Sequence, residues 1–146
     1  MVDPNEPGVV VVRGGAEGFA QEITAGRHCL TSDEPVSAGG TDLGPGPYEL
    51  LLAALGACTS MTVALYARRK GWALTGVTVR LRHSRIHAED CAECETERTM
   101  LDRIDREITL AGELTKEQRA KAIEIADKCP VHRTLTSEIN IRTTLL

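Results

Sequence analysis

Aromatic residues and an excess of positive charge are both scarce in this chain. Phe, Trp and Tyr make up 3% of its 146 residues, and the net charge is -4 at pH 7. Without aromatic rings for base stacking or a basic surface to attract phosphates, nucleic-acid binding is not expected. Hydrophobic residues still amount to 42% of the chain, so the core is expected to be aliphatic and rich in alanine.

A secretion signal and a long uninterrupted apolar run are not seen either. The first residues, MVDPNEPG, are acidic and broken by proline, unlike the basic and apolar parts of a signal peptide. The apolar run Leu50–Tyr66 is interrupted by glycine and hydroxyl residues and is followed by the basic cluster Arg68–Lys70, so it falls short of the roughly 20 apolar residues that a membrane span needs. We therefore expect a cytoplasmic protein with a buried helix here and no membrane partner.

The length favours one domain over residues 1–146, with a flexible N-terminus at residues 1–8. Alternating apolar residues predict strands, glycine and proline predict loops, and Pro47 and Thr115 offer helix starts, the latter in a capping box with Gln118. The expected elements are three short strands (Val9–Arg13, Phe19–Thr24, His28–Thr31), an exposed loop (Ser32–Pro47), a helix from Pro47 to about Lys70 stopped by Gly71, a strand pair (Val77–Leu81 and Arg103–Gly112), a helix from Thr115 to Lys128, a short turn or helix to Leu135, and a final strand (Glu138–Leu146). This order predicts an α+β fold.

The five cysteines form an odd set in a chain without a signal peptide. They lie at positions 29, 58, 91, 94 and 129. An odd number argues for free, catalytic or metal-bound thiols rather than a structural disulfide framework.

Cys129 has the local setting of a reactive thiol. It precedes Pro130 in the tetrapeptide CPVH, so it can cap a helix with its sulfur near unpaired N–H groups, which favour a thiolate. His132 lies three residues on and can share a face with it. Cys58, by contrast, sits in an apolar helix where a cysteine can simply pack as a small hydrophobic residue. From that segment alone, an inert and a catalytic Cys58 both stay open.

Two segments of the chain resemble the OsmC/Ohr superfamily of thiol-dependent peroxide reductases. They are GGTDLGPGPYELLLAALGAC, from Gly39 to Cys58, and KCPVHRTL, from Lys128 to Leu135, and the order of elements is similar over nearly the whole chain. The sequence looks closest to the YhfA-like branch. The resemblance implies antiparallel sheets wrapped around a long central helix that bears the first cysteine, in an intertwined homodimer with active sites at the subunit interface.

The resemblance also implies a reaction. Cys58 takes the role of the peroxidatic nucleophile, Cys129 that of the resolving thiol, and an external dithiol that of the reductant, with no cofactor or metal. We therefore expect a cytoplasmic thiol peroxidase that reduces hydroperoxides to alcohols in oxidative-stress defence. Apolar neighbours of Cys58, namely Leu52, Leu55 and Met61, would favour organic peroxides over hydrogen peroxide.

The activating residues depart from the family pattern. In its well-characterised peroxidases a glutamate follows the helix-starting proline and acts with an arginine on the cysteine, whereas here Tyr48 follows Pro47 and Glu49 comes next. At about 3.6 residues per turn, Glu49 would point about 180° away from Cys58, and Tyr48 only about 80° away. Tyr48, Glu49 and His132 are therefore the candidate supporting residues. Arg13 and Arg27 are the candidate arginines, and neither falls within a clear motif.

The segment HAEDCAEC contains a second group of candidate site residues. His87, Cys91 and Cys94 have a spacing found at zinc and redox sites, yet no fourth ligand lies nearby at a standard spacing, so no metal is expected. This segment has three possible interpretations: a solvated hairpin tip, an auxiliary dithiol or a metal site. Two other functions follow as alternatives to the peroxidase: a redox or metal-binding protein that uses these residues, and a non-catalytic OsmC-like dimer that binds a small molecule.

Overall fold

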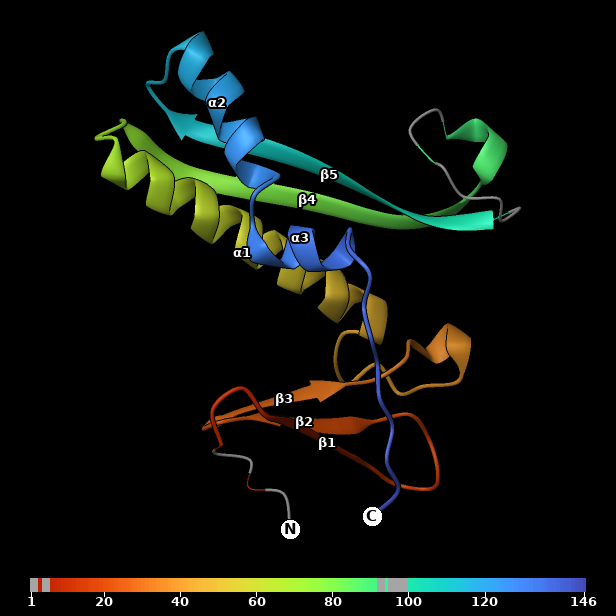
Figure 1. Cartoon of the computed structure of the whole chain (residues 1–146). Helices are drawn as coiled ribbons and strands as arrows, with labels where there is room; N and C mark the ends of the chain where they lie inside the picture. Colours follow the sequence, from red (N-terminus) through yellow and green to blue (C-terminus); the bar gives the residue numbers. More distant parts are fainter. Residues whose placement is uncertain (1–2, 4–5, 92–93, 95–99) are drawn as a thin grey trace. The chain divides into compact units, whose positions relative to one another are not determined.

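The computed structural model describes residues 3, 6–91, 94 and 100–146, and they form two compact units (Figure 1). The first unit is Met1–Leu51 and the second is Leu52–Leu146. The prediction of a single domain over residues 1–146 stays a prediction. So does the flexible N-terminus at residues 1–8, part of which lies outside the described residues.

The first unit holds a three-stranded antiparallel sheet in the order β1-β2-β3. Its strands are β1 (Val10–Gly14), β2 (Gln21–Ala25) and β3 (His28–Ser32). Ala25 pairs with His28 across a two-residue turn in which Gly26 has a φ of 57°, a left-handed conformation that suits glycine. The three predicted strands are thus present, each within two residues of its expected bounds.

The predicted exposed loop after β3 is organised around one buried carboxylate. Asp33 is 2% exposed and accepts hydrogen bonds from the Thr41 hydroxyl at 2.6 Å and from the backbone N–H groups of Glu34, Thr41 and Leu43. The hydrogen bond from the Thr41 side chain, helped by the three backbone ones, outweighs burial and holds the pKa of Asp33 below its usual value. The loop, which includes the short helix η1 (Val36–Ala38), is therefore fixed rather than loose.

Helix α1 (Pro47–Arg69) links the two units in sequence. Pro47 begins it as predicted, Glu49 Oε2 accepts a hydrogen bond from the Gly46 N–H at 2.8 Å, and Gly71 follows its end with a φ of 66°. By length and composition it could span a membrane, with a mean hydropathy of 1.8, but long core helices meet the same criterion. Its buried residues form one stripe, at positions 55, 56, 59, 63 and 67.

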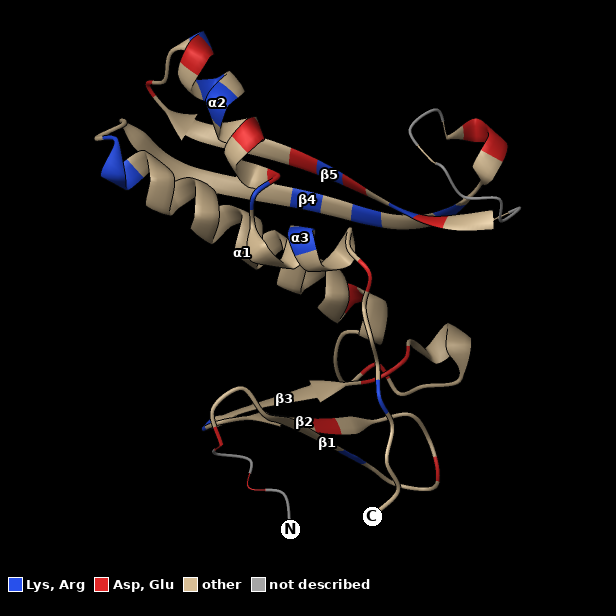
Figure 2. Ribbon diagram, in the orientation of Figure 1, with Lys and Arg blue, Asp and Glu red and all other residues tan. Residues whose placement is uncertain are grey.

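The second unit is built on a long antiparallel hairpin of β4 (Leu74–His87) and β5 (Met100–Gly112), followed by α2 (Lys116–Ala126) and α3 (Pro130–Leu135). Both signs of charge are present along the two strands (Figure 2). The capping box of Thr115 and Gln118 starts α2 as predicted. The core joins α1, the hairpin and α2 through Val63, Ala122 and Ala126, with Trp72, Leu74, Val77, Ile108 and Leu110 packed against them.

The hairpin is longer than its apolar pattern predicts. The prediction ended the first strand at Leu81, because polar residues follow, yet pairing continues to His87 opposite Met100. Strand pairing depends on backbone hydrogen bonds, and cross-strand polar contacts such as that of His83 Nε2 with Asp102 Oδ1, at 2.8 Å, suit an exposed face. The stretch beyond the strand contains η2 (Ala88–Asp90), and residues 92–93 and 95–99 lie outside the described ones.

The predicted final strand is wrong. Residues 138–146 have no regular structure, and Ile141 and Leu145 are 83% and 98% exposed. Alternating apolar residues make a strand only where an edge is available for pairing. Within the part of the chain that the structure describes, no strand pairs with this segment.

Candidate functional site

Cys129 is a fully buried helix cap. Its side chain is the N-cap of α3, its sulfur accepts a hydrogen bond from the His132 N–H at 3.3 Å, and Pro130 occupies the first turn. Its relative exposure is 0%. The sequence places a thiol here because α2 ends at Asp127 and proline cannot continue that helix, so the chain turns and starts again.

Cys58 and Thr59 lie in the part of α1 that is next to Cys129. Cys58 is half-buried and directly precedes Thr59 in α1. Thr59 is fully buried; its hydroxyl donates to the Leu55 carbonyl at 2.7 Å and its oxygen lies 3.9 Å from the Cys129 sulfur. The two cysteines that the sequence singled out are therefore neighbours in the fold.

Arg106 of β5 contacts residues of α1, α3 and the end of α2. Its guanidinium donates to the Thr59 hydroxyl at 2.9 Å, to Asp127 Oδ1 at 2.8 Å and to the Ala126 carbonyl at 3.5 Å. It also lies 3.1 Å from His132 Nδ1. Because a guanidinium has only donors, Nδ1 must be the acceptor, and His132 then carries its proton on Nε2.

These contacts favour the thiolate of Cys129. Burial raises the pKa of the Cys129 thiol, but the hydrogen bond from the His132 N–H, the neighbouring side chains of Cys58 and Thr59, and the charge of Arg106 outweigh burial and hold that pKa below its usual value.

A pocket of about 410 Å³ opens beside this cluster. Its apolar wall contains Leu55, one helical turn before Cys58, together with Ile104 and Leu135. Arg106 and His132 are among its polar residues, along with Asp102 and Thr136. The pocket therefore combines apolar side chains with the cationic Arg106, and its wall at Leu55 lies about one helical turn from Cys58.

The candidate supporting residues are divided between the two units. His132 lies in the second unit with both thiols, as described above. Tyr48 and Glu49 belong to the first unit, where Tyr48 is 58% exposed and Glu49 binds the Gly46 backbone. Their roles stay predictions. Arg13, one of the two candidate arginines, pairs with Glu22 at 3.9 Å on the strands of the first unit.

Sequence reasoning missed Arg106 and the part played by Thr59. The sequence did contain a signal for Arg106. It lies two residues from both Ile104 and Ile108, so all three share the inward face of the strand, where an apolar residue is expected. Its side chain is only 11% exposed, whereas that of its partner Asp127 is 61% exposed. A charged residue at an inward strand position indicates a buried polar network.

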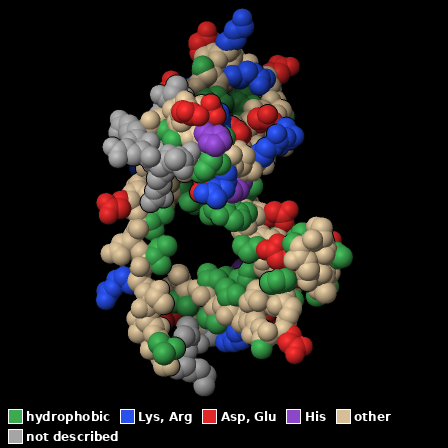
Figure 3. All heavy atoms as spheres, turned by 90° about the vertical axis from the view of Figure 1, so that its right-hand side faces the viewer, with side chains coloured by type: hydrophobic (Ala, Val, Ile, Leu, Met, Phe, Trp, Pro, Cys, Tyr) green, Lys and Arg blue, Asp and Glu red, His purple; other side chains and the backbone are tan. Residues whose placement is uncertain are grey.

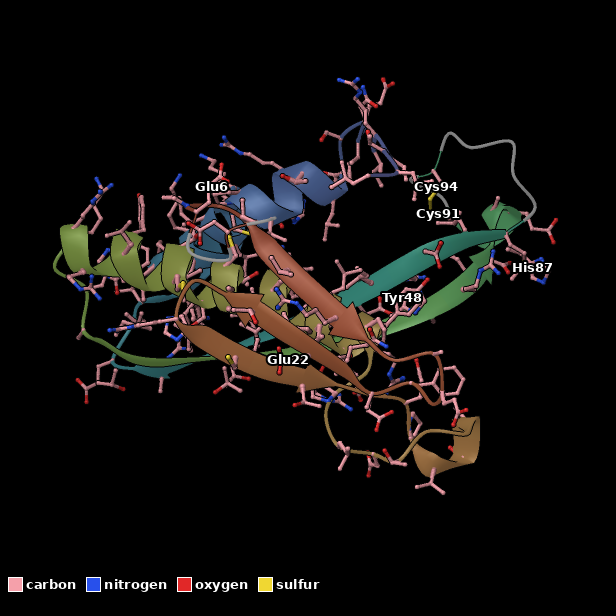
Figure 4. The ribbon with its side chains drawn as sticks, turned by 90° about the horizontal axis from the view of Figure 1, so that it is seen from below. Glu6, Glu22, Tyr48, His87, Cys91 and Cys94 are labelled. Atoms are coloured by element: carbon pink, nitrogen blue, oxygen red, sulfur yellow. A yellow bond between two sulfur atoms is a disulfide. The ribbon has the colours of Figure 1, made fainter. Side chains whose placement is uncertain are left out.

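Cys91 and Cys94 form a disulfide at the far end of the hairpin (Figure 4). His87 ends β4 in the same region. Among the described residues no group of three or more His, Cys, Asp and Glu side chains could hold a metal ion. Two sulfurs bonded to each other are not thiolate ligands. The interpretations of this segment as a hairpin tip, a dithiol or a metal site stay predictions. Cys29, in β3, is exposed and free.

Comparison with known proteins assigns the chain to a family. The model of the OsmC-like proteins matches residues 39–144, and the chain belongs to that family. An OsmC-like protein from Mycoplasma pneumoniae is 20% identical, with a TM-score of 0.70 over 94% of this chain and 96% of the other. No curated protein matches.

Two further similar structures are those of organic hydroperoxide resistance proteins. The organic hydroperoxide resistance protein OhrB of Bacillus subtilis is 20% identical (TM-score 0.60; 88% of this chain, 89% of the other). An organic hydroperoxide resistance protein OsmC from Legionella pneumophila is 19% identical (TM-score 0.63; 88% of both chains). These likenesses confirm the predicted α+β fold with antiparallel sheets and a long helix.

Proposed function

We propose that this protein is a thiol-dependent peroxidase that reduces organic hydroperoxides, with Cys58 as nucleophile and Cys129 as resolving thiol. The observation that carries the proposal is the position of Thr59, the residue after Cys58: its hydroxyl lies 3.9 Å from the Cys129 sulfur and accepts a hydrogen bond from Arg106. The names of its structural relatives, which include organic hydroperoxide resistance proteins, support the same reaction. A cytoplasmic location and a role in oxidative-stress defence belong to the proposal.

Exposure divides the roles between the two cysteines. Cys58 is half-buried and can meet a substrate, whereas the side chain of Cys129 has no exposed surface. A peroxide therefore reaches Cys58 first. The contacts that lower the pKa of Cys129 favour its thiolate form, which takes the proton from Cys58 in the proposed reaction.

The steps balance with these two thiols alone. The Cys58 thiolate attacks the O–O bond of the peroxide, forms a sulfenic acid and releases an alkoxide, which takes the transferred proton from Cys129 and leaves as the alcohol. The Cys129 thiolate then attacks the sulfur of the sulfenic acid and forms a disulfide, while hydroxide leaves and takes a proton from solvent. An external dithiol returns both sulfurs to the thiol state by exchange.

Arg106 supplies the positive charge in this scheme. Its guanidinium binds Thr59, and its charge contributes to lowering the pKa of Cys129, so it favours the thiolate form of that residue. It acts through Thr59 and His132 rather than by direct contact with the sulfur, so we regard it as a positioning residue.

The pocket supports organic substrates. Leu55, Ile104 and Leu135 line it, so an alkyl or aryl group would gain from burial there and hydrogen peroxide would not. Leu55 was one of the apolar residues near Cys58 that were expected to favour organic peroxides. Leu52 and Met61, named with it, are not among the lining residues, and Met61 is 70% exposed.

The peroxidase proposal is tested by a turnover assay. The purified protein with dithiothreitol should consume cumene hydroperoxide catalytically, with a kcat/KM at least about tenfold above that for hydrogen peroxide, since burying even two CH₂ groups is worth about 1.6 kcal/mol. Stoichiometric consumption without turnover, or no consumption, would favour the small-molecule-binding alternative.

We further propose that the protein is a homodimer, as its family resemblance implies. Figure 3 shows exposed hydrophobic side chains in each of the two units. Ala57, Met61 and Leu65 follow one another at four-residue intervals along α1, on the side of the helix opposite its buried stripe. This exposed apolar stripe, together with the apolar residues of the unpaired segment 138–146, is suited to a second copy of this chain.

Sedimentation tests the dimer. The wild type should have the mass of two chains, and Met61→Lys should shift it towards one chain because a charge would be buried at the interface. Ile123→Lys is the matched control, since Ile123 is 48% exposed on α2 and off this stripe, and it should leave the mass unchanged. A monomeric wild type would refute the dimer.

A further inference from the structure

The disulfide of Cys91 and Cys94 has no part in the reaction described so far. The chain holds three other cysteines, Cys29, Cys58 and Cys129, and all three are free. A structural staple that joins residues three apart closes only a very short loop and constrains the unfolded chain little. A Cys-x2-Cys pair is, however, an arrangement that opens and closes readily in thiol exchange.

This disulfide opens onto a pocket that adjoins the candidate site. The pocket measures about 540 Å³ and is lined by Cys91 and Cys94 together with residues of β5. Asp102, Ile104 and Arg106 are in its lining, and the same three residues line the pocket that Leu55 and His132 also border. The two pockets therefore share these three lining residues. One of them, Arg106, contacts Thr59 and His132.

We propose that Cys91 and Cys94, in their reduced form, are the built-in dithiol that regenerates Cys58 and Cys129 after each turnover. This inference rests on the proposed peroxidase function and deepens it, because it gives the path by which reducing equivalents enter. An external dithiol would then act on the Cys91–Cys94 disulfide at the end of the hairpin.

The exchange is a balanced two-electron transfer. A thiolate of the hairpin pair attacks the sulfur of Cys58 in the Cys58–Cys129 disulfide, and Cys129 leaves as a thiolate. The second thiol of the hairpin pair then attacks the mixed disulfide, closes the Cys91–Cys94 bond and releases Cys58. Two thiols are oxidised and two sulfurs are reduced, so no further oxidant is needed.

Burial and leaving-group chemistry give the attack this direction. Cys129 is fully buried, whereas Cys58 is half-buried, so Cys58 is the sulfur that an incoming thiolate can reach. The contacts that lower the pKa of Cys129 also make it the better leaving group, because exchange is faster when the departing thiol is more acidic.

The number of peroxide equivalents consumed without a reductant tests the relay. Fully reduced wild type should consume about two equivalents of cumene hydroperoxide per chain, one for each dithiol, and Cys91→Ser/Cys94→Ser only about one. Cys29→Ser is the matched control and should still consume about two. In the wild type, peptide mapping after rapid alkylation should show the Cys58–Cys129 disulfide first and Cys91–Cys94 later, at a rate independent of protein concentration.

A second measurement needs no peroxide and so separates the relay from the peroxidase proposal. In Cys94→Ser, treatment with diamide should yield a mixed disulfide between Cys91 and Cys58, because the thiol that completes the exchange is missing. If this adduct forms but the wild type consumes no peroxide, the exchange stands and the peroxidase proposal fails. If the wild type consumes one equivalent, keeps the Cys58–Cys129 disulfide, and Cys94→Ser gives no adduct, the relay is wrong and the peroxidase proposal stands.

Discussion

Replacing Cys58 with serine should lower kcat/KM for cumene hydroperoxide by a factor on the order of 10³ or more, under dithiothreitol in steady state. A serine hydroxyl is not ionised at neutral pH and cannot form the sulfenic acid, so the chemical step is lost rather than slowed. Cys58 is half-buried at the contact with Cys129, and serine is close to it in size. The variant should therefore fold, which circular dichroism and urea unfolding would verify.

Cys29→Ser provides the matched control for this loss. Cys29 is an exposed free thiol in the first unit, so its removal should leave kcat/KM within about twofold of the wild type. Equal activity of Cys58→Ser and wild type would remove Cys58 from the reaction. If Cys29→Ser instead lost the activity, the reacting thiol would lie in the other unit.

Replacing Arg106 with methionine should destabilise the fold and raise the pKa of Cys129. The guanidinium is 11% exposed and donates to Thr59, Asp127 and His132, so its loss should cost about 2 to 3 kcal/mol in the free energy of unfolding. Its charge also helps to hold the pKa of Cys129 below the usual value, so that pKa should rise in the variant. Thiolate absorbance near 240 nm, titrated against pH, would measure the change.

The pH dependence has a definite sign. The pKa of Cys129 is lower in the folded protein than in the unfolded chain, so its contribution to stability is complete above the unfolded pKa and is lost as the pH falls through the folded pKa. The variant loses part of that contribution. Its deficit in unfolding free energy relative to the wild type should therefore be larger at pH 9 than at pH 6.

Arg80→Met is the control for a lost arginine. Arg80 lies on β4, and its ion pair with Glu107 is 2.9 Å long between side chains that are each 69% exposed, so its loss should cost less than about 1 kcal/mol. It should leave the thiolate titration unchanged. If Arg106→Met were as stable as Arg80→Met and titrated like the wild type, the network around Thr59 would have no role in the site.

Local signals in the sequence were sufficient for the helices. Pro47 and Gly71 bound α1, the Thr115 and Gln118 pair begins α2, and the Cys129–Pro130 step begins α3. Each of these signals works within a turn or two of the chain, through orphan N–H groups or a φ that glycine tolerates. The fold class followed from the order of these elements and was supported by the family resemblance.

Contacts between distant residues could not be predicted in the same way. That Arg106 reaches Thr59, 47 positions away, depends on how β5 crosses α1, and nothing in either segment encodes the crossing. The final strand failed for a related reason, since Ile139 and Ile141 alternate correctly but find no edge within the described chain. The disulfide depends on the conformation of the hairpin tip, for which spacing alone left three readings open.

The most direct measurement of the central claim is the trapping of the first intermediate. Reduced Cys129→Ser, which lacks the resolving thiol, is treated with one equivalent of cumene hydroperoxide in the presence of dimedone, and the labelled peptide is identified by mass spectrometry. The account predicts a single dimedone adduct on Cys58 and none on Cys29. An adduct distributed over the other cysteines, or none on Cys58 although peroxide is consumed, would contradict the assignment of Cys58 as the attacking thiol.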